Sequence, residues 1–235
     1  EVYIAIGLPF ETQRLPKFKE LNPARRVIPL PDGVTRLRGE ADLALRGGAP
    51  GHEGHRHGLE TDDPHMWLSP KVMAETIPAI VAALSEARPE KAAYFAGRGA
   101  VLVKKTTGLD AYITSLFAPI AGGKRLFLTF HQSWAYYAEN YGLREVSVEL
   151  GGREPSPKDM AKLMAFAADN GVSVIVADPM TSQSVVTAIA RNIKGAAVTA
   201  NPLDEDWPGM LRGFSEALAK AMHKAPATTK AGQPR

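Results

Sequence analysis

The chain has 235 residues, of which 45% are hydrophobic and 23% charged, a composition typical of one large globular domain or two modest ones. No apolar run reaches the ~18 residues that a membrane-spanning helix needs, and the excess of 28 Lys and Arg over 25 Asp and Glu is too small and dispersed to indicate nucleic-acid binding. The absence of cysteine excludes disulfides, thiolate zinc sites and cysteine nucleophiles.

The first quarter of the chain predicts a few short elements and a long loop. Residues 2–6 predict a strand that ends at Gly7, residues 12–21 an amphipathic helix, and residues 27–30 a second strand. The first strand is already under way at residue 1 and no signal peptide is visible, so we expect a processed or truncated product. Residues 31–64 are rich in Gly, Pro, His and acidic residues, and we expect a mobile loop there.

Two helices are predicted in the middle of the chain. Apolar residues recur at helical spacing between Met73 and Leu84, although Pro78 should kink that helix or end it early. A second helix is expected from Pro89 to about residue 118, because Pro suits the first turn of a helix. It is long enough to bridge two lobes, and its three glycines weaken the expectation that it is continuous.

The second half alternates strands with helices, a pattern that predicts parallel pairing and an α/β domain. We expect a polar, disordered tail over residues 224–235. The expected strands are 125–130, 145–150, 172–177 and 196–200, and the expected helices are 132–141, 156 to about 171, 182–192 and a last one that contains Leu211, Phe214, Leu218 and Met222.

Polar residues follow three of these strands. His131 comes after the first, Asp178 after the third and Asn201 after the fourth. Because open parallel sheets bind ligands beyond the carboxyl ends of their strands, these side chains are candidate metal ligands in one crevice. The alternative is ordinary turn chemistry, since Asp-Pro and Asn-Pro both begin turns and a histidine can equally be a core or surface residue.

A second group of histidines lies upstream. His52, His55 and His57 fall in the expected loop, and short His-rich tracts bind metals, although a merely solvated loop explains them as well. His65 differs, because it adjoins the ordered stretch that begins at Met66 and would be held in place. Its alternative role is a helix-entry residue packed beside Trp67.

Other patterns argue mostly against enzymes. No G-x-S-x-G, H-E-x-x-H or G-x-x-x-x-G-K-[ST] sequence occurs, which removes the motif-based case for a serine hydrolase, a zinc protease or a nucleotide-binding loop. Glu149 and Glu154 are equally plausible as carboxylates that orient a ligating imidazole and as surface charges. The aromatic residues after His131 are expected in the core and the cleft wall; they are Trp134, Tyr136 and Tyr137.

Several segments together resemble the cluster A-I solute-binding proteins, the metal-specific components of bacterial ABC importers. Residues 63–70, D-P-H-M-W-L-S-P, resemble a family signature whose His binds the metal, and residues 130–137 resemble the second metal-histidine segment. Residues 152–159 resemble the turn G-x-E-P-S-x-x-D. The segments at Asp178-Pro179 and Asn201-Pro202-Leu203 fall where the family has E-P-like and D-P-L-like sequences.

The resemblance implies an α/β fold with two lobes of parallel sheet flanked by helices and joined by a long rigid helix. The expected parts are an incomplete first lobe over 1–88 with a His-rich loop at 48–64, a linking helix over 89–118, a second lobe over 119–223 and the tail. It also implies a metal bound between the lobes. The family's first ligand, a His early in the first lobe, has no counterpart here.

We therefore expect a receptor that captures Zn²⁺, with Mn²⁺ the less favoured metal because Asn201 is a neutral amide. His65 and His131 would bind it, with Asp178 as the leading oxygen donor and Asn201 as a lesser one. His52, His55 and His57 would collect metal and pass it on. The expected partner is a membrane permease, with the receptor a periplasmic or otherwise extracytoplasmic monomer.

Three alternatives stay open at this stage. A zinc-dependent hydrolase would use a similar site with a bound water, but it also needs a general base, for which the sequence offers no convincing candidate. An adhesin-like interaction protein could use the same scaffold with the metal incidental. A degraded or truncated family member could bind no metal specifically.

Overall fold

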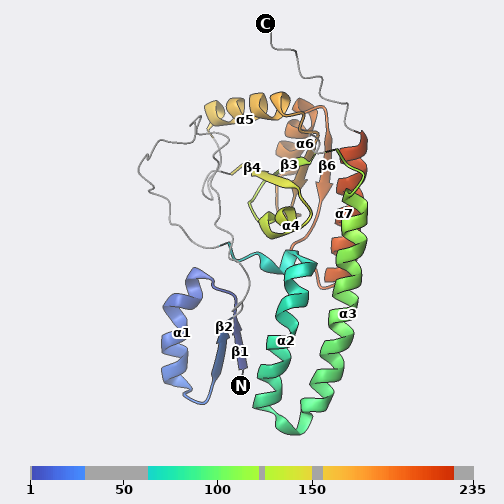
Figure 1. Cartoon of the computed structure of the whole chain (residues 1–235). Coiled ribbons are helices and arrows are strands. Elements are labelled where there is room, and N and C mark those ends of the chain that lie inside the picture. Colours follow the sequence, from blue (N-terminus) through green and yellow to red (C-terminus); the bar gives the residue numbers. More distant parts are fainter. Residues whose placement is uncertain (1, 30–62, 122–124, 150–155, 225–235) are drawn as a thin grey trace, which may run out of the picture. The chain divides into compact units, whose positions relative to one another are not determined.

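The structure is a computed structural model that describes residues 2–29, 63–121, 125–149 and 156–224 (Figure 1). The chain forms two compact units, and the described residues up to Tyr112 belong to the first while those from Ile113 onward belong to the second. The boundary therefore falls inside helix α3 (Ala92–Phe117). Among the described helices, none is both long enough and apolar enough to cross a membrane.

The first unit begins with a parallel β-α-β arrangement. Strand β1 (Val2–Ala5) pairs with β2 (Arg26–Pro29), and helix α1 (Pro9–Leu21) connects them. All three elements were predicted, but α1 begins three residues before the expected start at residue 12. The earlier start follows from a carboxylate in the first turn, since Glu11 binds the backbone that enters the helix.

Glu11 is a buried carboxylate that fixes the loop after β1. It is 3% exposed, and its Oε2 atom accepts the backbone N–H groups of Gly7 at 2.7 Å and Leu8 at 2.8 Å. Gly7 has φ of +87°, a left-handed conformation that suits glycine. The Tyr3 hydroxyl also donates to Glu11, and burial together with this contact raises the pKa of Tyr3. The Glu11 carboxylate thus fixes the turn between β1 and α1 through hydrogen bonds from Tyr3, Gly7 and Leu8.

The rest of the first unit contains the short helix η1 (Met66–Leu68) and helix α2 (Pro70–Ala87). The Ser69 side chain caps α2 by accepting the N–H of Val72. Of the two outcomes expected at Pro78, a kink or an early end, the early end does not occur, since α2 continues for nine residues beyond Pro78, to Ala87. Burial of the face that carries Val72, Ile77 and Ala83 offsets the lost backbone hydrogen bond.

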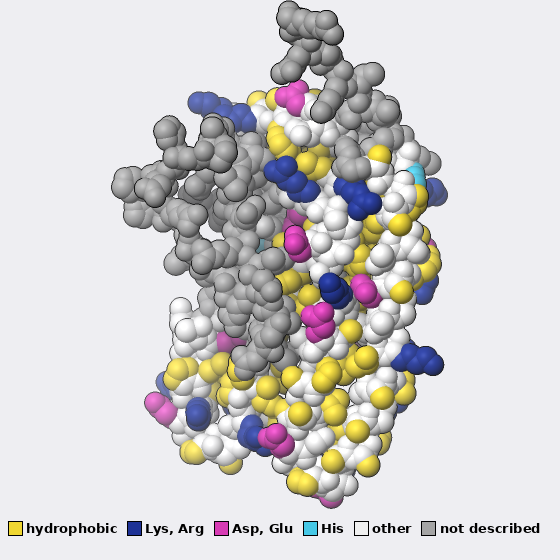
Figure 2. All heavy atoms as spheres, in the orientation of Figure 1, with side chains coloured by type: hydrophobic (Ala, Val, Ile, Leu, Met, Phe, Trp, Pro, Cys, Tyr) yellow, Lys and Arg dark blue, Asp and Glu magenta, His cyan; other side chains and the backbone are white. Residues whose placement is uncertain are grey.

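A short helix, η2 (Pro89–Lys91), leads into α3, which is continuous through its glycines. The glycine at position 99 has a structural reason, since a Cβ atom there would lie 2.4 Å from the Val81 side chain of α2. The two helices therefore approach closely at that point. Beside it lies an apolar groove with a volume of about 250 Å³, to which α2 contributes Ile80 and α3 contributes Leu102. Apolar side chains gather over these helices in Figure 2.

The second unit is built on a four-stranded parallel sheet. The strand order is β4-β3-β5-β6, with the chain passing through a helix between successive strands. This confirms the predicted α/β class with parallel strands and flanking helices. The strands are β3 (Leu126–Thr129), β4 (Arg144–Ser147), β5 (Val174–Ala177) and β6 (Ala196–Thr199), and the helices are α4 (Ala135–Asn140), α5 (Pro157–Asp169), α6 (Gln183–Asn192) and α7 (Trp207–Lys224).

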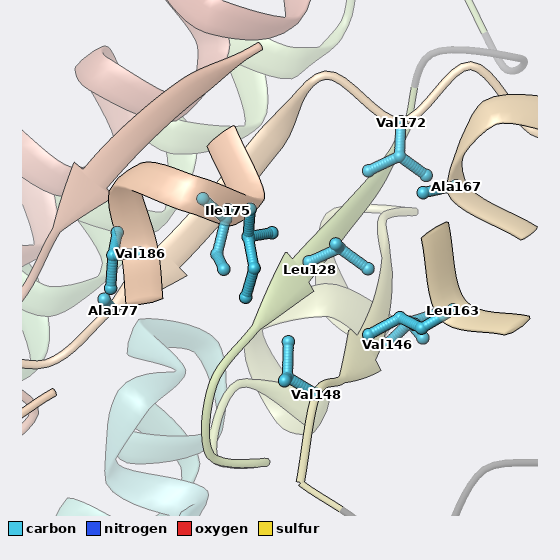
Figure 3. Close-up of a cluster of buried hydrophobic side chains, with 10 residues drawn as sticks. Leu128, Val146, Val148, Leu163, Ala167, Val172, Ile175, Ala177 and Val186 are labelled. Atoms are coloured by element: carbon cyan, nitrogen blue, oxygen red, sulfur yellow. The ribbon is translucent and has the colours of Figure 1, made fainter. Parts of the chain in front are cut away.

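The core of this unit lies between the sheet and helices α5 and α6 (Figure 3). Every residue of β5 is buried, as expected for a central parallel strand. Leu128 and Ile175, from neighbouring strands, are 0% exposed and pack in the same cluster as Leu163 of α5 and Val186 of α6. This cluster fixes the sheet, and with it the positions of the loops that follow each strand.

The differences from the predicted boundaries have local causes. Helix α4 begins at Ala135 and not at Gln132, because the two residues before it bind a strand side chain with their backbone N–H groups. Strand β4 ends at Ser147, three residues early, although two further ladder hydrogen bonds continue beyond it. Most of the expected loop and tail lies outside the described residues. The boundaries of the lobes and the linking helix stay a prediction.

Candidate metal centre

His65 is held by a neighbouring carboxylate. It directly precedes η1, and its Nδ1 atom lies 2.7 Å from Oδ1 of Asp63, which also accepts the His65 backbone N–H at 2.8 Å. Asp63 is buried, at 7% exposure, and the imidazole ring lies beside Trp67 with ring centroids 5.2 Å apart. The backbone and the ring of His65 are thus both oriented by the same acidic residue. The packing beside Trp67, which the sequence offered as the alternative role of His65, is also present.

His131 has a carboxylate partner of the same kind in the second unit. It follows β3 by two residues, and its Nδ1 atom lies 2.9 Å from Oε2 of Glu149. Glu149 stands two residues after β4, where its backbone N–H still bonds the carbonyl of Phe130. The contact that the sequence suggested between Glu149 and an imidazole is confirmed. Glu154, the other candidate, lies outside the described residues.

The two histidines therefore share one chemical arrangement. A carboxylate that accepts the Nδ1 proton fixes the tautomer in which Nε2 carries a lone pair. The same contact makes the imidazole a better electron donor, and metal-binding histidines are commonly supported in this way. His65 with Asp63, and His131 with Glu149, each show this pairing of an imidazole Nδ1 atom with a carboxylate oxygen.

The structure places the other two candidates in turns. Asp178 follows β5 directly, and its carboxylate accepts the N–H of Met180 at 2.7 Å and the hydroxyl of Thr181 at 3.0 Å. Asn201 comes two residues after β6, and its Oδ1 atom accepts the N–H of Leu203 at 3.1 Å. The turn chemistry that the sequence left open is therefore present at both positions.

The strands that precede His131, Asp178 and Asn201 are neighbours in the sheet, so their carboxyl ends share one edge. Within the residues that the structure describes, however, no group of three His, Cys, Asp or Glu side chains lies close enough to hold a metal ion. The ligand set stays a prediction. His52, His55 and His57 lie outside the described residues, and their role as an auxiliary site also stays a prediction.

Sequence reasoning missed the residue that organises the His131 segment. Glu145 of β4 accepts the hydroxyl of Thr129 at 2.8 Å and the backbone N–H groups of Ser133 at 3.0 Å and Trp134 at 3.2 Å, all with Oε1. These contacts reach the residues on both sides of His131. The sequence showed only an acidic residue at the start of the predicted strand 145–150, which by itself does not show what the carboxylate binds.

We expect Glu145→Ala to destabilise the second unit by about 2–3 kcal/mol, because it leaves buried donors of Thr129, Ser133 and Trp134 without their charged acceptor. Hydrogen exchange of the α7 amides, which belong to the second unit, measures the effect. Glu139→Ala, at an exposed position of α4, is the matched control and should change stability little. Equal stabilities of the two variants would contradict the role given to Glu145.

The aromatic residues after His131 form part of the core, as predicted. Trp134 stacks on Phe214 of α7 with ring centroids 3.9 Å apart, and the Tyr137 hydroxyl lies 2.6 Å from Oγ of Ser215. Burial raises the pKa of Tyr137, so this hydroxyl stays protonated. These contacts hold α4, and Trp134 directly before it, against α7. They thereby stabilise the residues that follow His131.

Comparison with known protein families shows to which family this chain belongs. The family described as zinc-uptake complex component A, periplasmic (ZnuA), matches residues 1–221, nearly the whole chain. The chain belongs to the ZnuA family. The predicted resemblance to metal-specific solute-binding proteins is thereby confirmed.

Individual ZnuA relatives agree in sequence and in fold. The zinc-binding protein AdcA of Streptococcus pyogenes serotype M3 is 30% identical over 167 residues, which are 70% of this chain and 32% of that protein. The high-affinity zinc uptake system protein ZnuA of Bacillus subtilis is 29% identical over 146 residues, or 60% of this chain and 44% of that protein. The matched part of the chain thus covers 32% of the length of AdcA and 44% of the length of the Bacillus subtilis ZnuA.

A crystal structure of ZnuA superposes with a TM-score of 0.79 at 28% identity, covering 94% of this chain and 80% of that one. The periplasmic zinc-binding protein TroA of Treponema pallidum superposes with a TM-score of 0.69 at 18% identity, a likeness that concerns the fold alone. The ZnuA fold is therefore shared over nearly all of the chain.

Proposed function

We propose that this ZnuA-family chain is a receptor that captures Zn²⁺ as cargo and presents it to the membrane component of an ABC importer. The observation that carries the proposal is the matched pair of histidines, each with its Nδ1 atom within hydrogen-bond distance of a carboxylate oxygen. Two such imidazoles are ligands that suit zinc.

His65 and His131 are the proposed nitrogen ligands, and we propose that both bind the same ion. Asp178 is the proposed oxygen donor, with Asn201 a lesser candidate, because a carboxylate has lone pairs beyond those that its turn uses. A set that contains two imidazoles and few carboxylates favours zinc over manganese, which prefers oxygen ligands.

The comparisons support this function and its setting. AdcA of Streptococcus pyogenes is named a zinc-binding protein, ZnuA of Bacillus subtilis belongs to a high-affinity zinc uptake system, and a ZnuA deletion mutant has been solved with zinc bound. The family description is of a periplasmic component of an uptake complex. An extracytoplasmic location, a permease partner and a binding role without catalysis are therefore proposed for this chain.

Titration of the purified, metal-free chain with Zn²⁺ against a chromophoric chelator tests the proposal. We expect one tightly bound zinc per chain and weaker competition by Mn²⁺. The loaded protein should not hydrolyse ester or phosphate substrates, which separates a receptor from a zinc hydrolase. Failure to bind zinc stoichiometrically, or a preference for manganese, would overturn the proposal.

A further inference from the structure

Two turns at the edge of the second-unit sheet have the same construction. One is Asp178-Pro179-Met180-Thr181 after β5 and the other is Asn201-Pro202-Leu203-Asp204 after β6. In each, the first side chain accepts the N–H of the third residue, and the fourth N–H bonds the first carbonyl at 3.1 Å. Strands β5 and β6 are hydrogen-bonded neighbours, so the two turns leave the same edge of the sheet side by side.

Each turn presents a large apolar side chain to solvent at its third position. Met180 is 93% exposed and Leu203 is 78% exposed. Turn tips are ordinarily polar, and apolar side chains exposed together mark an interaction site more often than one exposed alone. Proline at the second position and the double hydrogen bonding hold both turns in one conformation, which lowers the entropy that binding would cost.

The charged residues within these two turn segments are all acidic. Residues 178–182 and 200–209 contain no Lys or Arg, and the second segment has three consecutive exposed acidic residues, Asp204, Glu205 and Asp206. Asp204 and Asp206 are fixed by accepting backbone N–H groups at 2.9 and 3.2 Å. A complementary surface would therefore offer an apolar recess bordered by basic side chains.

We propose that Met180 and Leu203, with the acidic border at residues 204–206, form a docking surface for the membrane permease of the uptake complex. This inference rests on the proposed function for the choice of partner, because the family is a component of a complex and its cargo must leave toward another component. The surface lies at the same sheet edge as His131 and Asp178, so docking takes place where the proposed cargo ligands emerge.

The test compares the full chain with its Met180→Ser/Leu203→Ser double variant. Labelled protein is bound to phosphatidylethanolamine–phosphatidylglycerol vesicles that contain the reconstituted permease and ATPase, and to vesicles without them. We expect at least about 10-fold weaker binding to the permease vesicles for the double variant. Glu205→Lys should also weaken binding to the permease vesicles, and the binding that remains should depend less on salt concentration than that of the wild type. The dissociation constant for zinc, measured without vesicles, should be unchanged in both variants.

Leu21→Ser is the matched control, because Leu21 is 75% exposed but lies on α1 of the first unit. Three outcomes would overturn the docking surface. They are full binding of the double variant to the permease vesicles, an equal loss of that binding in Leu21→Ser, and equal binding of the wild type to vesicles with and without the permease. Absence of zinc binding by the wild type would instead overturn the proposed function, and a loss of permease binding by the double variant would still support the surface.

Discussion

Replacing His131 by Ala is expected to weaken zinc binding by more than about 100-fold, since loss of a ligand should exceed the 10–100-fold cost of losing a supporting contact. His131 supplies one of the two proposed nitrogen ligands, and no other histidine lies in the described part of the loop that follows β3. Competition against a chelator of known affinity measures the change. His65→Ala should have a comparable effect, because we propose that both histidines bind one ion.

Two further variants make this result specific. Glu149→Gln removes the anionic partner of His131 and should weaken binding by about 10–100-fold, less than loss of the imidazole itself. His223→Ala changes an exposed histidine of α7 and should leave zinc affinity as it is. If His131→Ala bound zinc as tightly as His223→Ala does, His131 would not be a ligand.

Trp134→Ala should destabilise the second unit by about 3–5 kcal/mol, the range for removing a buried aromatic side chain. Trp134 is 2% exposed, stacks on Phe214 and meets Tyr137 edge-on with ring centroids 5.6 Å apart. Its loss would leave a large cavity between α4 and α7. Because the chain has two units, hydrogen exchange of the α7 amides is the appropriate measurement, since it reports on the second unit alone.

Trp134→Phe is the control for this variant. A phenyl ring retains stacking on Phe214 and fills much of the volume, so its cost should be less than half that of the alanine variant. A loss below about 1 kcal/mol for Trp134→Ala would show that α4 and α7 are not held together by this residue.

The fold of the second unit was largely predictable because its signals are local. Apolar strands alternate with amphipathic helices, and Gly142 and Gly171 have φ of +62° near the points where helices were expected to end. The early end that was one of the two outcomes expected at Pro78 does not occur, for a tertiary reason. A local rule counts the hydrogen bond that proline removes, whereas the buried face of α2 packs against other elements, among them β1 and η1.

The candidate site was predictable only in part for the same reason. The sequence marks His65 and His131 and offers Glu149 as a carboxylate that could orient an imidazole, whereas the partnership of Asp63 with His65 was not predicted. Glu145 could not be assigned, because its role depends on the pairing of β3 with β4 and on a loop that folds back over it. Asp178 and Asn201 carry both a turn signal and a ligand signal, and a single sequence does not separate the two.

The position of Glu145 also bears on the order in which this unit acquires its structure. The carboxylate that fixes the backbone on both sides of His131 comes from β4, which is synthesised later and must first align with β3. We therefore do not expect bound zinc to nucleate the folding of the second unit, because the His131 loop takes its shape only after β3 and β4 have paired. Zinc should accordingly slow unfolding of the native chain without accelerating its refolding.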